Sequence, residues 1–311
     1  METIEAGRQV PHHADGAVAP LTPPRAAVTL RRYLDLMKLR IGAMIALTAV
    51  AGYAAVAPAV RPGPALALAV AMMLGSAASA VFNHVWDRDI DRLMRRTRNR
   101  PLAAGVLSVE AALWLAAALL AGGLTLAVTA FNWVVALHLF LGAFVYAVLY
   151  TVWLKRRTWL NIVIGGAAGS FAVLAGAAVV RPDDWLLPLL LAAVLFLWTP
   201  SHFWSLAILL VDDFRAAGLP MLPVVVGEQR TAWWILANSV ALVAASLLPW
   251  ALGCLGPIYG AAAAGLGAGL LGLNLKLVEC PSRKWAGWNF AASIPYLLGL
   301  LVAVVLARHW G

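Results

Sequence analysis

Long apolar stretches, separated by short polar segments, run through most of this 311-residue chain. A helix that crosses a membrane needs about 20 predominantly apolar residues. By this criterion the sequence predicts nine spans, near residues 41–60, 64–86, 109–129, 132–152, 159–180, 184–209, 232–252, 255–277 and 288–307. Gly, Pro and Ser interrupt several of them, which membrane helices tolerate where neighbouring helices satisfy the backbone. We therefore expect an all-α polytopic membrane bundle of about nine transmembrane helices.

Basic residues between the spans indicate the orientation. If successive loops lie on alternate sides, all but three of the 23 Lys and Arg residues fall on one side, and the exceptions are Arg61, Arg181 and Arg308. The positive-inside rule then places the N-terminus and the two long loops, 87–107 and 210–231, in the cytoplasm. We expect a multi-pass protein, placed in a bacterial inner membrane. Its net charge of +9 reflects this topology, so the expected surroundings are the lipid bilayer and not nucleic acid.

Composition supports one membrane domain in place of two soluble ones. Hydrophobic residues make up 63% of the chain and charged residues 12%, and the mean hydropathy is +0.85, far from soluble usage. The N-terminal segment is rich in Ala, Pro, Gly and His and shows no evident signal peptide. We predict a disordered cytoplasmic tail over residues 1–30 and a single transmembrane domain over 31–311. The two cysteines, Cys254 and Cys280, do not suggest a disulfide framework or a zinc site.

The first long loop begins with an acidic ladder. Asn83, Asp87 and Asp91 are spaced four residues apart, and each step of four turns only about 40° around an α-helix, so the three side chains share one face. Mg²⁺ prefers oxygen ligands and usually takes one or two carboxylates, with water and phosphate oxygens in its other positions. We therefore predict Asp87 and Asp91 as metal ligands. Mn²⁺ accepts the same ligands, so the pattern fits either ion.

Two arginines follow the ladder with the same spacing. Arg96 and Arg100 carry guanidinium groups, whose paired donors match phosphate oxygens. A divalent cation beside arginines describes a diphosphate site. Neutralising a diphosphate makes it a better leaving group, so an allylic C–O bond can ionise toward a carbocation that a carbon nucleophile captures.

A simpler interpretation of the same loop is a solvated helix end. In that case Asp87, Asp89 and Asp91 pair only with nearby arginines, namely Arg88, Arg92 and Arg95, as most charge runs do. Spacing alone does not decide between the two.

A longer pattern favours the chemical interpretation. Residues 83–101 read Asn-x3-Asp-x3-Asp-x2-Met-x-Arg-Thr-x2-Arg-Pro, which resembles the first signature of the UbiA-type intramembrane prenyltransferases in their haem-farnesylating branch. Similar features of that branch occur at 38–41, 150–166 and 202–204. The stretch from Asp213 to Pro223 resembles the second-loop signature of the haem branch more than that of the quinone branch. Many relatives outside the haem branch carry a second Asp-x3-Asp pair in this loop. Here Leu209 stands four residues before Asp213 in place of an aspartate, so we expect no symmetrical two-metal clamp.

The resemblance implies a UbiA-prenyltransferase-like fold and assigns roles to residues. The expected catalytic residues are Asn83, Asp87, Asp91 and Asp213. The expected substrate-binding residues are Lys38, Arg40, Arg96, Arg100, Lys155, Asn161 and His202. Several assignments have a plainer alternative: His202 packs in a span with a neighbouring hydrogen bond, and the basic run at 155–157 only marks topology. Lys38 and Arg40 have the same ambiguity as that basic run. For His84, which lies beside the ladder, a structural role is favoured.

The implied reaction is transfer of a farnesyl group from farnesyl diphosphate to the 2-vinyl group of haem b, giving haem O for terminal oxidases. Haem b would be a substrate and not a prosthetic group, and haem A synthase or oxidase assembly proteins would be the protein contacts. Two other functions stay open: prenylation of an aromatic quinone precursor by the same fold, and a non-enzymatic membrane protein that transports or handles haem.

Overall fold

Helix boundaries follow the polar interruptions between the apolar stretches. The computed structural model describes residues 30–183 and 185–309. Its elements are α1 (Leu30–Leu36), α2 (Leu39–Val56), α3 (Pro62–Trp86), α4 (Arg88–Leu93), α5 (Val109–Ala130), α6 (Trp133–Phe144), the π-helix η1 (Val145–Leu154), α7 (Asn161–Gly165), α8 (Ala167–Ala177), α9 (Leu186–Leu209), α10 (Val211–Ala216), α11 (Leu222–Val226), α12 (Glu228–Ala251), α13 (Pro257–Glu279) and α14 (Arg283–His309). The described residues contain no strand.

Nine helical segments of the described chain are long and apolar enough to cross a membrane. They match the nine predicted stretches, and two of them each combine two consecutive elements, α6 with η1 and α7 with α8. The ninth differs most, because it begins at Arg283 and not near residue 288. The predicted all-α, multi-pass architecture is confirmed. The predicted tail, apart from Leu30 at the start of α1, lies outside the described residues, and the single-domain boundary stays a prediction.

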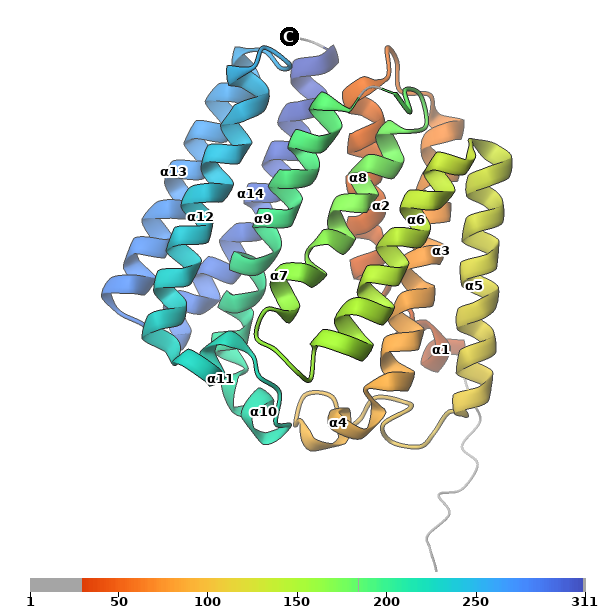
Figure 1. Cartoon of the computed structure of the whole chain (residues 1–311), viewed down its shortest axis with the longest axis vertical. Coiled ribbons are helices and arrows are strands. Elements are labelled where there is room, and N and C mark those ends of the chain that lie inside the picture. The colour runs from red at the N-terminus through yellow and green to blue at the C-terminus, as the bar shows by residue number, and fades with distance from the viewer. Residues whose placement is uncertain (1–29, 184, 310–311) are drawn as a thin grey trace, which may run out of the picture.

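The spans stand side by side in two groups (Figure 1). One group contains α9, α12, α13 and α14, and the other contains α2, α3, α5, α6 and α8. Contacts of α8 with α9 and of α14 with α2 join the two groups. The short helices α4, α10 and α11 lie together at one end, which we call the loop end, and α14 finishes at the opposite end (Figure 1). The two long predicted loops therefore share one end of the bundle.

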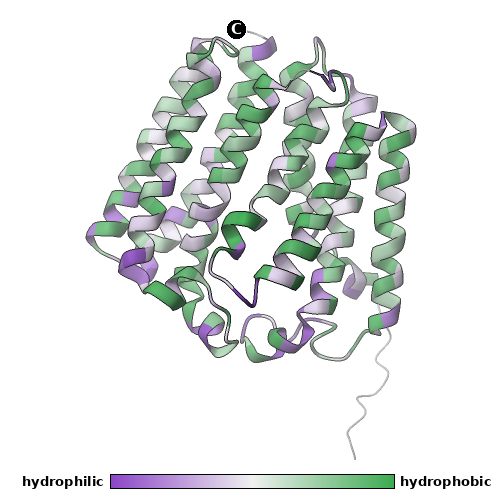
Figure 2. Cartoon of the chain, viewed as in Figure 1, coloured by the Kyte–Doolittle hydropathy of each residue, from purple (hydrophilic) through white to green (hydrophobic). Residues whose placement is uncertain are grey.

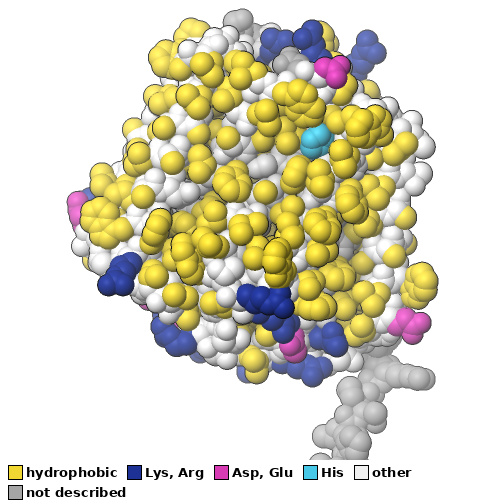
Figure 3. Space-filling model, viewed as in Figure 1, with side chains coloured by type: hydrophobic (Ala, Val, Ile, Leu, Met, Phe, Trp, Pro, Cys, Tyr) yellow, Lys and Arg dark blue, Asp and Glu magenta, His cyan; other side chains and the backbone are white. Residues whose placement is uncertain are grey.

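The outside of the bundle is apolar along its length. Hydrophobic residues dominate the helices, while hydrophilic residues concentrate at the loop end (Figure 2). In the space-filling view, Lys and Arg side chains lie toward the two ends and leave a hydrophobic middle (Figure 3). Large side chains such as Trp114 and Leu66 are about 70% exposed on this surface, at 71% and 68%. A continuous apolar surface of this kind is satisfied by lipid and would be a liability in water.

Polar contacts join helices inside the group formed by α9, α12, α13 and α14. Asn238 Nδ2 on α12 donates to Ser201 Oγ on α9 at 2.7 Å, and Ser239 Oγ on α12 donates to Asn274 Oδ1 on α13 at 3.0 Å. Association of helices in lipid lacks a hydrophobic driving force, so interhelical hydrogen bonds and close packing stabilise it. These bonds account for the buried polar residues that interrupt the apolar spans here.

Helices α2 and α8 approach each other to a distance that only glycine permits. A Cβ on Gly176 would overlap the backbone oxygen of Ala49, and a Cβ on Gly52 would overlap that of Val173. Small residues at an interface let membrane helices come this close. The contact fixes α2 and, with it, the position of Lys38 just before its first residue.

We expect Gly176→Ala to destabilise the protein, because the added methyl group collides with backbone that has no rotamer to change. Overpacking a core costs about 1–3 kcal/mol, and a backbone clash belongs at the upper end. Thermal unfolding in detergent measures the effect. Gly169→Ala is the matched control on the same helix, since a Cβ at that position would meet nothing within 4 Å and alanine has the higher helix propensity. Equal melting temperatures for the two variants would contradict the close-approach explanation.

Candidate active site

The two long loops meet at the loop end through Asp213. The Arg96 backbone N–H donates to Asp213 Oδ2 at 3.4 Å, and Arg95 Nε lies 3.9 Å from Asp213 Oδ1. Beside this contact, Ile90 of the first loop and Phe214 of the second belong to one hydrophobic cluster. Asp213, predicted as a catalytic residue, thus connects the loop of α4 to the loop of α10.

The acidic ladder continues from α3 into α4. Asp87 N donates to Asn83 O at 2.9 Å and Asp91 N donates to Asp87 O at 2.8 Å, so helical hydrogen bonding persists through the bend at Asp87. All three residues are buried, with exposed fractions of 3%, 0% and 1% in chain order. The Asn83 amide donates to Asp87 Oδ2 at 2.7 Å. The structure therefore places the three predicted residues on successive helical turns, away from solvent.

Basic side chains from other segments pair with both carboxylates. Lys155 Nζ donates to Asp87 Oδ2, and Arg100 Nη1 donates to the two oxygens of Asp91 at 3.0 and 2.8 Å. A buried carboxylate without a partner costs several kcal/mol, so these pairs offset the cost of burying Asp87 and Asp91. The second oxygen, Asp87 Oδ1, is buried without a hydrogen-bond partner, and Arg156 Nη2 lies 3.8 Å from it.

The arginines next to the ladder contact other groups. Arg88 and Arg92 donate to backbone carbonyls at 2.8 and 2.7 Å, and Arg95 reaches the second loop. Asp89 is bonded by Arg156 through two contacts of 2.7 Å, and this bonding lowers the pKa of the Asp89 carboxyl to about 2. Within the described residues, the alternative prediction of local pairing along the acidic run is therefore wrong.

The π-helix η1 brings Lys155 to the ladder. Its hydrogen bonds span five residues, as Lys155 N shows by donating to Tyr150 O at 2.9 Å. Residues five apart then face nearly the same side, whereas an α-helix would turn them roughly 140° apart. The sequence predicts one continuous α-helical span over 132–152, so the π-helical segment is a correction. The π-helical geometry aligns Tyr150 and Lys155 on the side that faces Asp87.

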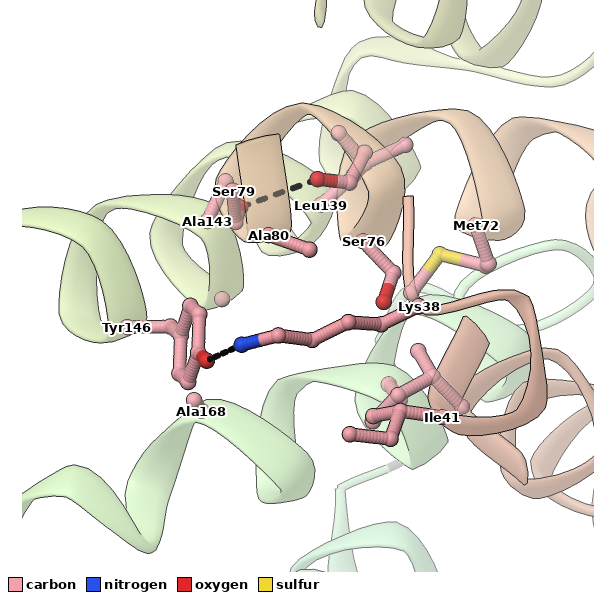
Figure 4. A pocket seen from close by; sticks show the side chains of 14 residues that line it. Lys38, Ile41, Met72, Ser76, Ser79, Ala80, Leu139, Ala143, Tyr146 and Ala168 are labelled. Carbon is pink, nitrogen blue, oxygen red and sulfur yellow. Dashed lines mark hydrogen bonds between the residues drawn. The ribbon is translucent and has the colours of Figure 1, made fainter. Parts of the chain in front are cut away.

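Lys38 lies on the other side of the ladder. It precedes α2 in the left-handed region, with φ 48°, and is the one non-glycine residue of the described chain with positive φ. Its Nζ donates to Asn83 Oδ1 at 2.8 Å. It also donates to the Tyr146 hydroxyl at 3.3 Å (Figure 4). Burial, together with the nearby Arg100 cation, lowers the pKa of the Lys38 ammonium to about 7. Backbone strain of this kind often occurs at functional sites.

A polar pocket of about 830 Å³ opens beside the ladder. Seven predicted site residues line it, namely Lys38, Arg40, Asn83, Asp91, Arg96, Arg100 and Lys155. Burial lowers the pKa of the Arg96 guanidinium, and the neighbouring Arg100 cation adds to the effect. Asp87 does not line the pocket itself but contacts two residues that do, Asn83 and Lys155. Met94, Phe203 and other apolar side chains form a further part of the lining.

A second, apolar pocket adjoins the first inside the bundle. Figure 4 shows this apolar pocket from close by. Side chains of α2, α3, α6 and α8 line it, including Ile45, Met72, Leu139 and Ala172. Three residues line both pockets: Lys38, Ile41 and Tyr146. The pair of pockets can accept an amphiphile whose charged head and hydrocarbon chain lie on opposite sides of this boundary.

Two predicted substrate-binding residues do not line the polar pocket. Asn161 is fully buried, and its amide donates to the Thr158 carbonyl at 2.7 Å, which supports the turn after Lys155. The ring of His202 stacks between Trp198 and Phe290, with centroids 4.2 and 4.6 Å away. Its Nδ1 also lies 2.6 Å from Ser293 Oγ. These contacts match the plainer alternative for His202, and its contact with haem stays a prediction.

Sequence reasoning assigned no role to several residues that the structure brings to the site. Tyr146 and Tyr150 line the polar pocket, and Thr151 accepts a bond from Asn83 Nδ2 at 3.1 Å. Tyr150 follows Tyr146 by four residues, and Lys155 follows Tyr150 by five. This spacing was the available signal, but it is hard to recognise because both tyrosines lie within an apolar stretch. His84 also lines the pocket, and both of its ring nitrogens are buried without a hydrogen-bond partner. A purely structural role for His84 stays a prediction.

The donor set fits Mg²⁺ that arrives with a diphosphate. Asp87 and Asp91 supply carboxylate oxygens, Asn83 bonds both Asp87 and Lys38, and Asp87 Oδ1 is a buried acceptor without a hydrogen-bond partner. The described residues contain no group of three or more His, Cys, Asp or Glu that could hold a metal alone. Mg²⁺ rarely uses an all-protein cage and takes substrate phosphates as ligands, so two carboxylates are sufficient.

Comparison with known proteins identifies one family of membrane enzymes. Residues 45–298 match the UbiA prenyltransferase family model. The chain is 67% identical to protoheme IX farnesyltransferase 1 of Paramagnetospirillum magneticum over 91% of this chain and 100% of that protein. It is 42% identical to protoheme IX farnesyltransferase of Alkalilimnicola ehrlichii, over 90% of this chain and 93% of that protein.

Solved structures share the fold at low sequence identity. A digeranylgeranylglyceryl phosphate synthase superposes with a TM-score of 0.75 at 20% identity, covering 90% of this chain and 98% of that one. A UbiA homologue from Archaeoglobus fulgidus, bound to GPP and Mg²⁺, gives a TM-score of 0.66 at 17% identity, covering 88% and 99%. The arrangement of the helices is therefore shared with these proteins.

We expect Lys155→Met to be strongly destabilising, because it leaves the Asp87 carboxylate buried without its cation. Breaking a buried pair costs about 3–5 kcal/mol, whereas removing both charges in the double variant Asp87→Asn, Lys155→Met costs less than the two single changes combined. Thermal unfolding of the purified protein measures all three. Lys276→Met is the control, since its pair with Glu279 is exposed and worth about 0–1 kcal/mol. Additive effects of the two single changes would refute a coupled buried pair.

Proposed function

This chain belongs to the UbiA prenyltransferase family, and from that premise we propose that it is a protoheme IX farnesyltransferase. It transfers the farnesyl group of farnesyl diphosphate to the 2-vinyl group of haem b and so makes haem O. The observation that carries the proposal is the polar pocket beside the buried ladder, which continues into an apolar pocket across the boundary at Tyr146. The named relatives, matched over nearly their full length, support haem as the acceptor.

The diphosphate occupies the polar pocket in this proposal. Lys38, Arg96, Arg100 and Lys155 line it, and their cations stabilise the negative charge that grows as the C–O bond breaks. The farnesyl chain lies in the apolar pocket between α2, α3, α6 and α8. Binding energy from the chain then holds the reacting carbon at the boundary between the two pockets.

Asp87 and Asp91 would hold Mg²⁺, with Asn83 beside them. Bound there, the ion neutralises diphosphate oxygens and makes the diphosphate a better leaving group. Mn²⁺ would serve equally, because it accepts the same oxygen ligands. Arg100 and Lys155, which pair with these carboxylates, are then free to turn their donors to the phosphate oxygens. The same side chains thus satisfy the buried carboxylates before binding and the diphosphate after it.

Haem b is the second substrate and supplies the nucleophile. The π electrons of its vinyl group form the new C–C bond to C1 of the farnesyl group, and the positive charge moves to the vinyl carbon next to the pyrrole. Water adds to that carbon, and its proton passes to the departing diphosphate. The apolar lining of the polar pocket, which includes Met94, Phe203, Leu206 and Phe214, offers a surface for the porphyrin.

The setting of the reaction follows from the charge distribution. Basic residues gather at the loop end, so we place this end and the N-terminus in the cytoplasm and the protein in a bacterial inner membrane. Both substrates are amphiphilic and reach the site from lipid. The product serves terminal oxidases, and haem A synthase or oxidase assembly proteins are the proposed protein contacts.

The decisive test incubates membranes containing the protein with haem b, farnesyl diphosphate and Mg²⁺, and detects haem O by mass spectrometry. We expect product from wild type and from the control Asp212→Asn, whose carboxylate is exposed and pairs with Arg283. Asp87→Asn should reduce the rate by about 10²–10³-fold, because the ladder loses a metal ligand. Prenylation of an aromatic acid by wild type, with no haem O, would favour the quinone-precursor alternative. Failure to release diphosphate with either acceptor would favour a transporter or haem-handling protein.

A further inference from the structure

The boundary between the two pockets is where the reacting bond of a prenyl diphosphate would lie. The diphosphate fits the polar pocket and the chain fits the apolar pocket, so the bond between C1 and the bridging oxygen crosses the boundary. Of the described residues, Lys38, Ile41 and Tyr146 line both pockets. The bond that breaks therefore lies near these three residues.

Tyr146 is the member of this set that can stabilise a carbocation. Ile41 presents only alkyl groups, and a protonated Lys38 attracts the departing diphosphate but repels a neighbouring cation. An aromatic ring, by contrast, has a negative face that attracts cations, most strongly where water is excluded. Tyr146 is therefore the candidate for the carbon side of the breaking bond, and Lys38 for the oxygen side.

The orientation of the ring fits this role. Lys38 Nζ lies 5.9 Å from the Tyr146 ring centroid and 3.3 Å from its hydroxyl oxygen, which places the ammonium at the hydroxyl end and not over the face (Figure 4). Tyr150 stacks on Tyr146 with centroids 5.6 Å apart and an interplanar angle of 24°. Both tyrosines belong to η1, so their spacing is fixed by one helical segment. The part of Tyr146 that lines the apolar pocket stays available to a prenyl chain.

We propose that the aromatic ring of Tyr146 stabilises the allylic carbocation formed when the C1–O bond of the prenyl diphosphate breaks. The inference rests on the proposed prenyl-transfer function. Both electrons of the bond leave with the diphosphate, and the positive charge is shared between C1 and C3 of the chain. The acceptor's vinyl π pair then closes the C–C bond. Tyr146 gains and loses no bond, proton or electron, so the step needs no further reactant.

The test separates recognition of the cation from recognition of the chain. Purified full-length protein with Mg²⁺ is titrated calorimetrically with two ligands: a protonated amine analogue of the farnesyl cation together with inorganic diphosphate, and farnesyl thiolodiphosphate, which keeps the same chain but ionises slowly. The variants are Tyr146→Phe, which keeps the ring, and Tyr146→Leu, which removes it. Phe144→Leu is the matched control, because it removes a ring just before η1 on the exposed outside of the bundle.

We expect Tyr146→Leu to weaken binding of the amine analogue by about 10- to 30-fold, as loss of a desolvated cation–π contact requires. Binding of the thiolodiphosphate should change by less than about threefold, because its uncharged chain makes no cation–π contact with the ring. Tyr146→Phe keeps the ring and should keep the preference for the amine analogue over the thiolodiphosphate, and Phe144→Leu should bind both ligands like wild type.

Three results would overturn the assignment. Equal weakening of both ligands in Tyr146→Leu would show a structural role, and equal loss in Tyr146→Phe and Tyr146→Leu would assign the effect to the hydroxyl. If wild type binds neither ligand, the prenyl-diphosphate site itself is refuted, and the role of Tyr146 with it. The titration uses no acceptor, so failure of haem as acceptor leaves the result on Tyr146 intact and the two failures are distinguishable.

Discussion

Two carboxylates buried at one end of a membrane bundle impose the central constraint on this structure. Asp87 and Asp91 are essentially inaccessible, and each has to find a cation from elsewhere in the chain. Asp87 takes Lys155 from the end of η1, and Asp91 takes Arg100 from the loop after α4. Asn83 is fixed in turn by Lys38 at the start of α2. Satisfying the ladder therefore draws α2, α3, η1 and the first loop together around one pocket.

The same constraint prepares the site for its ligand. The cations that neutralise the carboxylates are the groups that a diphosphate would use, and the carboxylates are the groups that Mg²⁺ would use. A metal diphosphate can therefore replace internal ion pairs with equivalent contacts and leave no buried charge unpaired. Directly beside this charged region the lining becomes apolar, with Lys38, Ile41 and Tyr146 at the change. An amphiphilic donor matches both parts, and the reacting bond lies between them.

Some of this arrangement is local in sequence, and some is not. The nine spans follow from the lengths of apolar stretches, and the ladder follows from a spacing of four residues. The partners of the ladder could not be predicted in the same way, because Lys155 is 68 residues from Asp87 and reaches it only through a π-helix. Nearly every residue of η1 is apolar or aromatic, so hydrophobic periodicity does not distinguish an α-helix from a π-helix here, and Tyr146 and Tyr150 did not stand out. His202 shows the converse: the resemblance implied a substrate contact, while aromatic stacking and Ser293 already satisfy its ring.

A structure of the protein with farnesyl thiolodiphosphate and Mg²⁺, determined by crystallography or cryo-electron microscopy, tests this account most directly. We expect the ion at Asp87 and Asp91, phosphate oxygens within hydrogen-bond distance of Arg100 or Lys155, and the farnesyl chain between α2, α3, α6 and α8. A diphosphate bound away from the ladder, or a chain that leaves the apolar pocket empty, would contradict it.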